Sequence, residues 1–134
     1  MKRSIGVDYG TKRVGLAISD SLGMVATPLT VLERRSAVDD IVKLVQDRDV
    51  GTIVVGLPTG LDGTEGQSAR DARNLGDELK RQTGVEVVFR DERFTSRMAE
   101  NALLESGMRR RDRRNTVDKV AASIILQDYL DSQT

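Results

Sequence analysis

The alternation of apolar and polar residues at the start of the chain predicts a β-hairpin. Strands are expected over residues 3–9 and 14–19, joined by a turn at Gly10–Arg13. A third strand is expected over Met24–Leu32. Pro28 within it favours an edge position, because proline cannot donate a hydrogen bond to a neighbouring strand. The first part of the chain therefore predicts three antiparallel strands that follow one another.

Beyond these strands, helical spacing alternates with short apolar runs. Ser36 followed by Asp39 resembles a helix N-terminal capping pattern, and the apolar residues after it recur at helical spacing. The run Thr52–Leu57 predicts a buried parallel strand. A second helix is expected to end near Gly84, and a fifth strand to follow over Val85–Phe89.

Two more helices are expected in the last part of the chain. Thr95 or Ser96 is expected to cap the first of them, and Thr116 the second, which runs to about Leu130. This order predicts one α/β domain over residues 1–134. Its mixed five-stranded sheet has three antiparallel strands, then two parallel ones, with helices on both faces.

Composition narrows the chemistry that such a fold can support. The sequence has no cysteine and no histidine, which excludes disulfides, thiolate and imidazole metal ligands, and histidine-dependent triads. A metal ion would need oxygen ligands, which favours Mg²⁺, Mn²⁺ or Ca²⁺. Lys and Arg total 21 and match 21 Asp and Glu, so bulk charge does not attract nucleic acid. Two Tyr and two Phe are too few for a base-stacking platform, so recognition of nucleic acid would rest on backbone and shape.

The hydropathy pattern gives no sign of a membrane or of secretion. No segment approaches the roughly 18 apolar residues of a membrane span. The first residues, Met1–Ser4, lead directly into a strand and lack the apolar core of a signal peptide. We therefore expect a cytoplasmic protein with no membrane partner.

Asp8 is the first candidate for chemistry, because it follows an apolar strand that is predicted to be central. A carboxylate there is costly to bury unless it is paired or binds a cation, and it would face the crevice where open α/β sheets bind ligands. Gly10 permits close approach of a ligand, and Lys12 and Arg13 can contact phosphate. The alternative is an ordinary hairpin whose Asp8 pairs with Arg13.

Further acidic candidates follow later elements. Asp91 and Glu92 end the fifth predicted strand, and alternation turns one of them toward the crevice without deciding which. Asp118 opens the last predicted helix with small alanines on its face, although taken alone it is better explained as an acid that complements the helix dipole. Together with Asp8 these acids predict a site for one or two divalent cations, which would neutralise their repulsion and serve phosphodiester cleavage.

An arginine-rich segment and a glycine-rich segment are further candidates for binding a ligand. Five arginines occur within six residues just before Asp118, and guanidinium groups suit phosphate oxygens, so contact with nucleic acid is favoured over a merely solvated loop. The glycine-rich segment 56–66 precedes a helix, where it could cradle an anion, and Asp62 or Glu65 could contribute a further carboxylate. It fits neither the P-loop nor the dinucleotide fingerprint, and a flexible flap is the favoured interpretation. The five arginines of the run before Asp118 are Arg109, Arg110, Arg111, Arg113 and Arg114.

Four motifs give the chain its similarity to a known family. They are Asp8-x-Gly10-x-x-Arg13-x-Gly15-x-Ala17, Val55-Gly56-Leu57-Pro58, Asp91-Glu92-Arg93-x-Thr95-Ser96 and Asp118-x-x-Ala121-Ala122. In this order, and over nearly the whole chain, they resemble the YqgF/RuvX family. Its members are small bacterial proteins with a ribonuclease H-like fold, similar to Holliday-junction resolvases.

The resemblance implies a metal-dependent nuclease in which Asp8, Glu92 and Asp118 are the catalytic acids and hold Mn²⁺ or Mg²⁺. The family is described both as maturing the 5′ end of pre-16S ribosomal RNA and as resolving branched DNA, so structured RNA, branched DNA or both are the expected partners. The arginine run is longer here than the family leads us to expect. The expected substrate-binding residues are Lys12, Arg13, Arg93, Thr95, Ser96 and the five arginines of the run.

Two other functions stay open on the sequence. Residues 8–11 also resemble the first phosphate loop of the actin, chaperone and sugar-kinase superfamily, but those proteins need two such domains and this length supplies one. A non-catalytic assembly factor that binds RNA or protein would keep the fold without turnover. A homodimer through the third helix or the edge strand is compatible with the pattern, which does not determine it.

Overall fold

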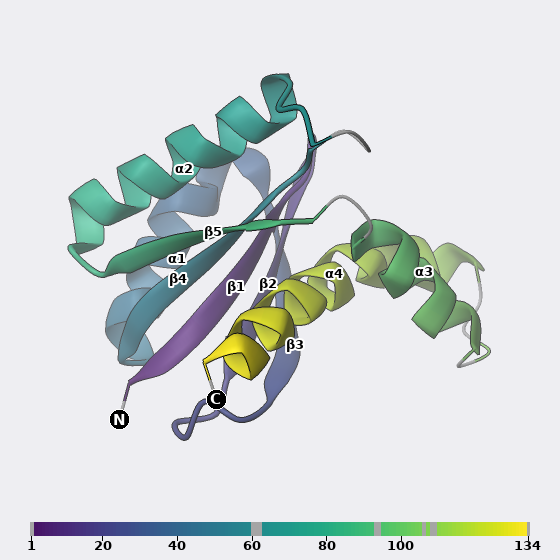
Figure 1. The fold of residues 1–134 in the computed structure, drawn as a ribbon, viewed down its shortest axis with the longest axis horizontal. Helices are drawn as coiled ribbons and strands as arrows, with labels where there is room; N and C mark the ends of the chain where they lie inside the picture. The colour runs from purple at the N-terminus through teal and green to yellow at the C-terminus, as the bar shows by residue number, and fades with distance from the viewer. Residues whose placement is uncertain (1, 60–62, 93–94, 106, 108–109, 134) are drawn as a thin grey trace.

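Five strands form one mixed sheet in the order β3-β2-β1-β4-β5 (Figure 1). The computed structural model describes residues 2–59, 63–92, 95–105, 107 and 110–133, without the side chains of residues 95–97, 100 and 110–115. The antiparallel strands are β1 (Arg3–Tyr9), β2 (Arg13–Ser19) and β3 (Ala26–Glu33), and the strands parallel to β1 are β4 (Val50–Leu57) and β5 (Glu86–Asp91). The predicted architecture is confirmed, including the edge position of the strand that contains Pro28.

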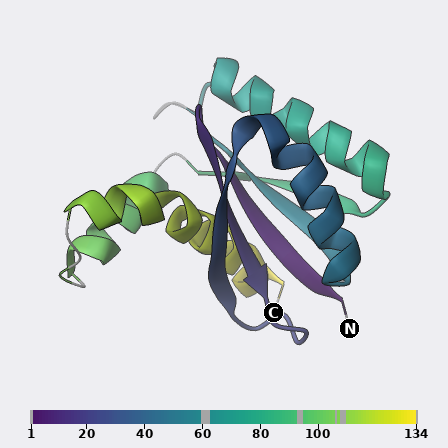
Figure 2. The ribbon, with the colours of Figure 1, turned by 180° about the vertical axis from the view of Figure 1, so that it is seen from behind.

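Helices cover both faces of this sheet. On one face lie α1 (Ala37–Asp47), which follows a 3-10 turn at Arg34–Ser36, and α2 (Gln67–Thr83). The opposite face is crossed by α4 (Arg110–Ser132), and α3 (Thr95–Glu105) packs on α4 and projects beyond the sheet (Figures 1 and 2). None of the helices in the described part of the chain has the length and hydropathy that crossing a bilayer requires.

Alternation along the strands builds two cores. Ile5 and Val7 of β1 are fully buried in the larger cluster, which α1 and α2 complete. Gly6 and Asp8 point to the other face, where α4 contributes Leu126 to a smaller cluster. The carboxylate of the first strand therefore lies on the side of the sheet that α4 covers.

The start of the last helix differs from the prediction. Helical backbone begins at Arg110 instead of Thr116, so Thr116 does not cap the helix, and residues 110–114 of the arginine run belong to its first turns and not to a loop. Arginine is a good helix former, and residues 110–132 contain neither glycine nor proline, so no residue in this segment stops the helix.

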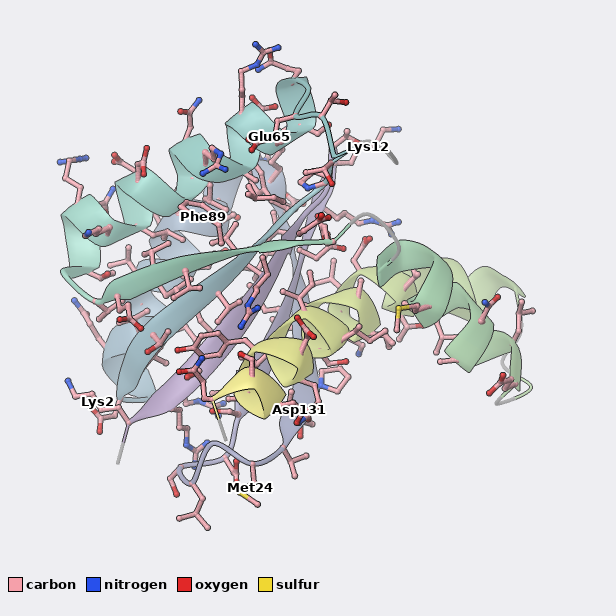
Figure 3. All side chains as sticks on the ribbon, viewed as in Figure 1. Lys2, Lys12, Met24, Glu65, Phe89 and Asp131 are labelled. Atoms are coloured by element: carbon pink, nitrogen blue, oxygen red, sulfur yellow. The ribbon has the colours of Figure 1, made fainter. Side chains whose placement is uncertain are left out.

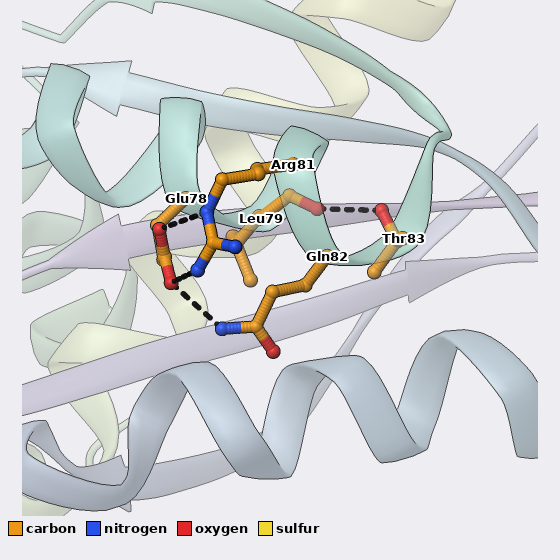
Figure 4. A network of polar contacts seen from close by, with 5 residues as sticks. All are labelled: Glu78, Leu79, Arg81, Gln82 and Thr83. Atoms are coloured by element: carbon orange, nitrogen blue, oxygen red, sulfur yellow. Dashed lines mark hydrogen bonds and ion pairs between the residues drawn. The ribbon is translucent and has the colours of Figure 1, made fainter.

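The sequence predicted the end of the second helix correctly and the side-chain cap of the first one wrongly. Gly84 ends α2 in the left-handed region with φ +73°, as predicted. Figure 4 shows the polar contacts of this last turn, in which Arg81 and Gln82 donate to Glu78. Ser36 does precede α1, but its hydroxyl donates to a carboxylate oxygen of Asp40 at 3.0 Å instead of capping the helix backbone.

Candidate active site

The close approach of α4 to the β1–β2 hairpin positions the site. Asp8 lies opposite Gly15 in the strand register. A Cβ at Gly15 would lie 2.0 Å from the carbonyl oxygen of Asp118, and a Cβ at Gly6 would lie 2.6 Å from that of Ala122. Two glycines therefore let the helix backbone rest directly on the strands. This contact places Asp118 beside the strand end that carries Asp8.

Asp8 and Glu92 form a buried pair of carboxyl groups. Their residues are 7% and 8% exposed, and the two side chains share a hydrogen bond. Burial raises the pKa of Asp8 to about 6, against a lowering contribution from the hydrogen bond with Glu92. Burial and then the charge of Asp8 raise the pKa of Glu92 to about 9. Without a cation, the pair therefore retains a proton at neutral pH.

At the end of β5 the chain turns Glu92, and not Asp91, toward Asp8. Asp91 is exposed and accepts a hydrogen bond from the Thr59 hydroxyl at 2.8 Å. The Glu92 side chain lies against Gly56, where a Cβ would be 2.6 Å from Oε2. Strand alternation left both residues open, and the packing around Gly56 distinguishes them.

One oxygen of Glu92 suits a cation. Its Oε2 atom is buried and has no hydrogen-bond partner within the described part of the chain. Once the pair loses its proton, an unpaired buried carboxylate oxygen is costly, and carboxylate oxygens are the ligands that hard divalent cations prefer. The residues present at this position therefore fit Mg²⁺ or Mn²⁺.

Asp118 lies next to the pair but is engaged by Arg13. The Nε atom of Arg13 is 3.4 Å from Oδ2 of Asp118. Partial burial raises the pKa of Asp118, while Arg13 acts to lower it. Across the described residues, no three acidic side chains stand close enough together to hold a metal ion. A site with three carboxylates therefore requires the Asp118 side chain to turn from Arg13 toward Asp8.

A basic pocket opens beside these acids. It has a volume of about 220 Å³ and is lined by Gly10, Thr11, Lys12, Arg13 and Asp118. Lys12 lies at the end of the sheet where β1 finishes (Figure 3). The turn that the sequence predicted to contact phosphate therefore borders the predicted acidic site.

Several predicted site residues lie outside the described side chains. The backbone places Thr95 at the start of α3. Glu65 is described, and it pairs with Arg73 at 2.7 Å, so its carboxylate is engaged on α2 and is not added to the site. The residues without described side chains are Asp62, Arg93, Thr95, Ser96, Arg109, Arg110, Arg111, Arg113 and Arg114.

Sequence reasoning did not single out Arg34. In the structure its guanidinium donates a hydrogen bond to the carbonyl oxygen of Thr11 in the pocket-lining turn. The register of β2 with β3, in which Arg13 pairs with Glu33, brings Arg34 beside the turn, and the sequence pattern did not determine this register.

The sheet order and the helix across it define a ribonuclease H-like fold. The chain resembles the solved structure "T. thermophilus RuvC in complex with Holliday junction substrate" with a TM-score of 0.59, over 99% of this chain and 96% of the other. The two sequences are 14% identical, so this likeness concerns the fold alone.

The family described as "RuvX: Holliday junction resolvase" matches residues 2–132, and the chain belongs to this family. It is 40% identical to the "Putative pre-16S rRNA nuclease" of Lactococcus lactis subsp. cremoris (strain MG1363), over 97% of this chain and 94% of the relative. It is 43% identical to the protein of the same name from Anaeromyxobacter sp. (strain Fw109-5), over 98% of each chain. The family and fold that the motifs predicted are confirmed.

Proposed function

We propose that this chain is a metal-dependent nuclease that hydrolyses phosphodiester bonds in structured RNA, with the 5′ end of pre-16S ribosomal RNA as the substrate and branched DNA as a second one. The names of the relatives support the substrate class. The observation that carries the proposal is the buried Asp8–Glu92 pair, with one unpaired oxygen, beside a basic pocket. Such an activity belongs in the cytoplasm.

Each group in the site has a role in this proposal. Asp8 and Glu92 would hold Mg²⁺ or Mn²⁺, with Asp118 as a further ligand. When bound, the ion would activate water and stabilise charge on the leaving oxygen. Lys12 and Arg13 would bind the phosphate, and transfer of Arg13 from Asp118 to that phosphate would free the Asp118 carboxylate. The sequence has no imidazole, so a histidine base is excluded.

The double variant Asp8→Asn with Asp118→Asn tests this proposal. Both carboxylates become amides of nearly the same size, so the fold should persist while the negative charge that binds the ion is removed. We expect cleavage of a structured pre-16S RNA fragment in Mn²⁺ to fall at least about 100-fold, the scale of losing a group that stabilises transition-state charge.

Asp91→Asn is the matched control, because Asp91 is exposed and bound to Thr59 outside the pair. It should cleave like the unchanged protein, both on RNA and on a four-way DNA junction. Cleavage by the double variant at the level of this control would refute the proposal.

One observation favours a second function. The Arg13–Asp118 ion pair stands where a third metal ligand is needed, and no described group of three acids is ready to hold an ion. A non-catalytic factor that binds RNA or a protein partner would be compatible with this arrangement. Calorimetry distinguishes the two, since RNA affinity without any Mn²⁺ binding would support the binding factor.

A further inference from the structure

Arg34 joins three parts of the fold around the turn that lines the pocket. Its backbone N–H donates to the carbonyl oxygen of Lys12 at 3.3 Å, and its Nη1 atom donates to that of Thr11 at 3.3 Å. Its guanidinium carbon lies 4.4 Å from the centre of the Tyr9 ring. Its Nη2 atom donates to Oδ2 of Asp71, on α2, at 2.8 Å. One side chain therefore links the end of β1, the turn and α2.

These contacts are better shielded than an ordinary surface ion pair. The side chains of Arg34 and Asp71 are 31% and 29% exposed, whereas the neighbouring Arg35, which pairs with Glu33, is 86% exposed. Gln67 also donates to Asp71 at 2.8 Å, which orients the carboxylate. Hydrogen bonding by Arg34 lowers the pKa of Asp71. Partial burial weakens screening by solvent, so this pair holds its geometry more firmly than Arg35 does.

The turn needs such support because its own side chains are open to solvent. Thr11, Lys12 and Arg13 are all exposed, and the turn is closed by a hydrogen bond from the N–H of Gly10 to the carbonyl oxygen of Arg13 at 2.9 Å. Exposed turns with few buried contacts open easily. Arg34 binds the two carbonyl groups between these closing residues, where an external contact restrains the turn most directly.

We propose that Arg34 is a positioning residue, whose side chain holds the Thr11 carbonyl group beside the backbone bond to that of Lys12, so that Lys12 and Arg13 are presented to the substrate phosphate. The inference rests on the proposed function, because the phosphate pocket is part of it. A guanidinium suits this role, since its planar fork donates in two fixed directions while its face stacks on Tyr9. Lysine cannot make all of these contacts at once.

The test compares Arg34→Met with Arg35→Met, two variants that remove the same charge from adjacent positions. Fluorescence anisotropy of a labelled structured RNA in EDTA would measure affinity. We expect Arg34→Met to weaken RNA binding about three- to tenfold more than Arg35→Met does. In Mn²⁺ its KM should rise more than its kcat falls, with Mn²⁺ affinity unchanged, and Arg34→Lys should recover part of the loss.

Hydrogen exchange separates this inference from the proposed function. In Arg34→Met the amides of residues 10–13 should exchange faster, whether or not the protein binds RNA. If the unchanged protein binds no RNA, the proposed function fails. The exchange data alone then test whether Arg34 restrains the turn. Should Arg34→Met not fold, Asp71→Ala removes the link to α2 and should shift both readouts in the same direction. Unchanged exchange, or equal RNA losses in the Arg34 and Arg35 variants, would overturn the inference.

Discussion

At the scale of single residues, the Asp8–Glu92 pair sets how the protein responds to pH. Both carboxyl groups are buried on the face under α4, and burial favours their neutral forms. Such a pair adds little to stability by itself, because charges in a low-dielectric setting are costly unless they are compensated. A divalent cation, as proposed, would compensate the charge of this pair.

The metal-free protein is expected to lose stability as the pH rises from about 4.5 to about 9. Burial raises the pKa of Glu92 to about 9 in the folded state, against 4.5 for an ordinary glutamate, so the folded state binds more protons within this window. This contribution is full below the unfolded pKa and is lost as the pH rises through the folded one. Urea unfolding in EDTA at pH 5, 7 and 9 measures the slope.

Glu92→Gln should flatten this pH dependence, because an amide does not titrate. Asp91→Asn should keep most of the slope, because the charge of the exposed Asp91 is only the smallest of the causes that raise the pKa of Glu92. If Glu92→Gln unfolds with an unaltered pH dependence, another group is responsible and the assignment is wrong.

At the scale of elements, the contact of α4 with the β1–β2 hairpin is the feature on which the site depends. The helix backbone at Asp118 lies where a side chain of Gly15 would stand, and this contact brings an acid from late in the sequence to the end of the first strand. The small residues Ala121 and Ala122 on α4 are both fully buried. The geometry of the site therefore depends on the close packing of these small residues as well as on the acidic residues.

Gly15→Ala is expected to lower the free energy of unfolding by about 1–3 kcal/mol or more, since this is the usual cost of forcing extra volume into a packed region. The added methyl group would lie 2.0 Å from the Asp118 carbonyl oxygen, which belongs to backbone and cannot rotate away. Displacement of α4 should also reduce cleavage. Chemical denaturation and the RNA assay measure the two effects.

Gly66→Ala is the control for this substitution. A Cβ there would have no heavy atom within 4 Å, and Gly66 has φ −98°, which alanine adopts freely. Gly66 is the N-cap of α2, where alanine is less favourable than glycine by roughly 0.5–1 kcal/mol, so the loss of stability in Gly66→Ala should stay below that of Gly15→Ala, and its activity should stay near that of the unchanged protein. If Gly15→Ala is equally well tolerated, α4 does not rest on β2 as described.

At the scale of the whole molecule, one sheet separates a larger core under α1 and α2 from a smaller one under α4 (Figure 1). The proposed metal site draws on β1, the segment after β5, and α4. An ion that binds these elements together binds the folded state and not the unfolded chain. Metal binding should therefore raise the free energy of unfolding of the whole protein.

Mn²⁺ at about 100 times its dissociation constant should raise the free energy of unfolding by about 2.7 kcal/mol. Asp8→Asn should lose most of this increase, because it removes a ligand from the buried pair, whereas Asp91→Asn should retain it. Thermal or urea unfolding across a Mn²⁺ titration provides the measurement. An equal increase in Asp8→Asn would place the ion elsewhere.

The sequence by itself determined the sheet and most element boundaries. Strand alternation predicted the hairpin, Pro28 marked the edge strand, and Gly84 marked the end of α2. These features depend on side-chain period and turn chemistry, which act between residues close together in the chain. The family motifs also named Asp8, Glu92 and Asp118 as the candidate metal ligands.

Only the tertiary structure decided how these acids stand toward one another. It buried Glu92 beside Asp8 and left Asp91 exposed, a choice that strand alternation had left open, it paired Asp118 with Arg13, and it brought Arg34 to the turn. It also extended the last helix back to Arg110. The first three outcomes join residues distant in sequence through packing across strands and helices, for which no local period exists, and the fourth reflects a helix that continues wherever no residue stops it.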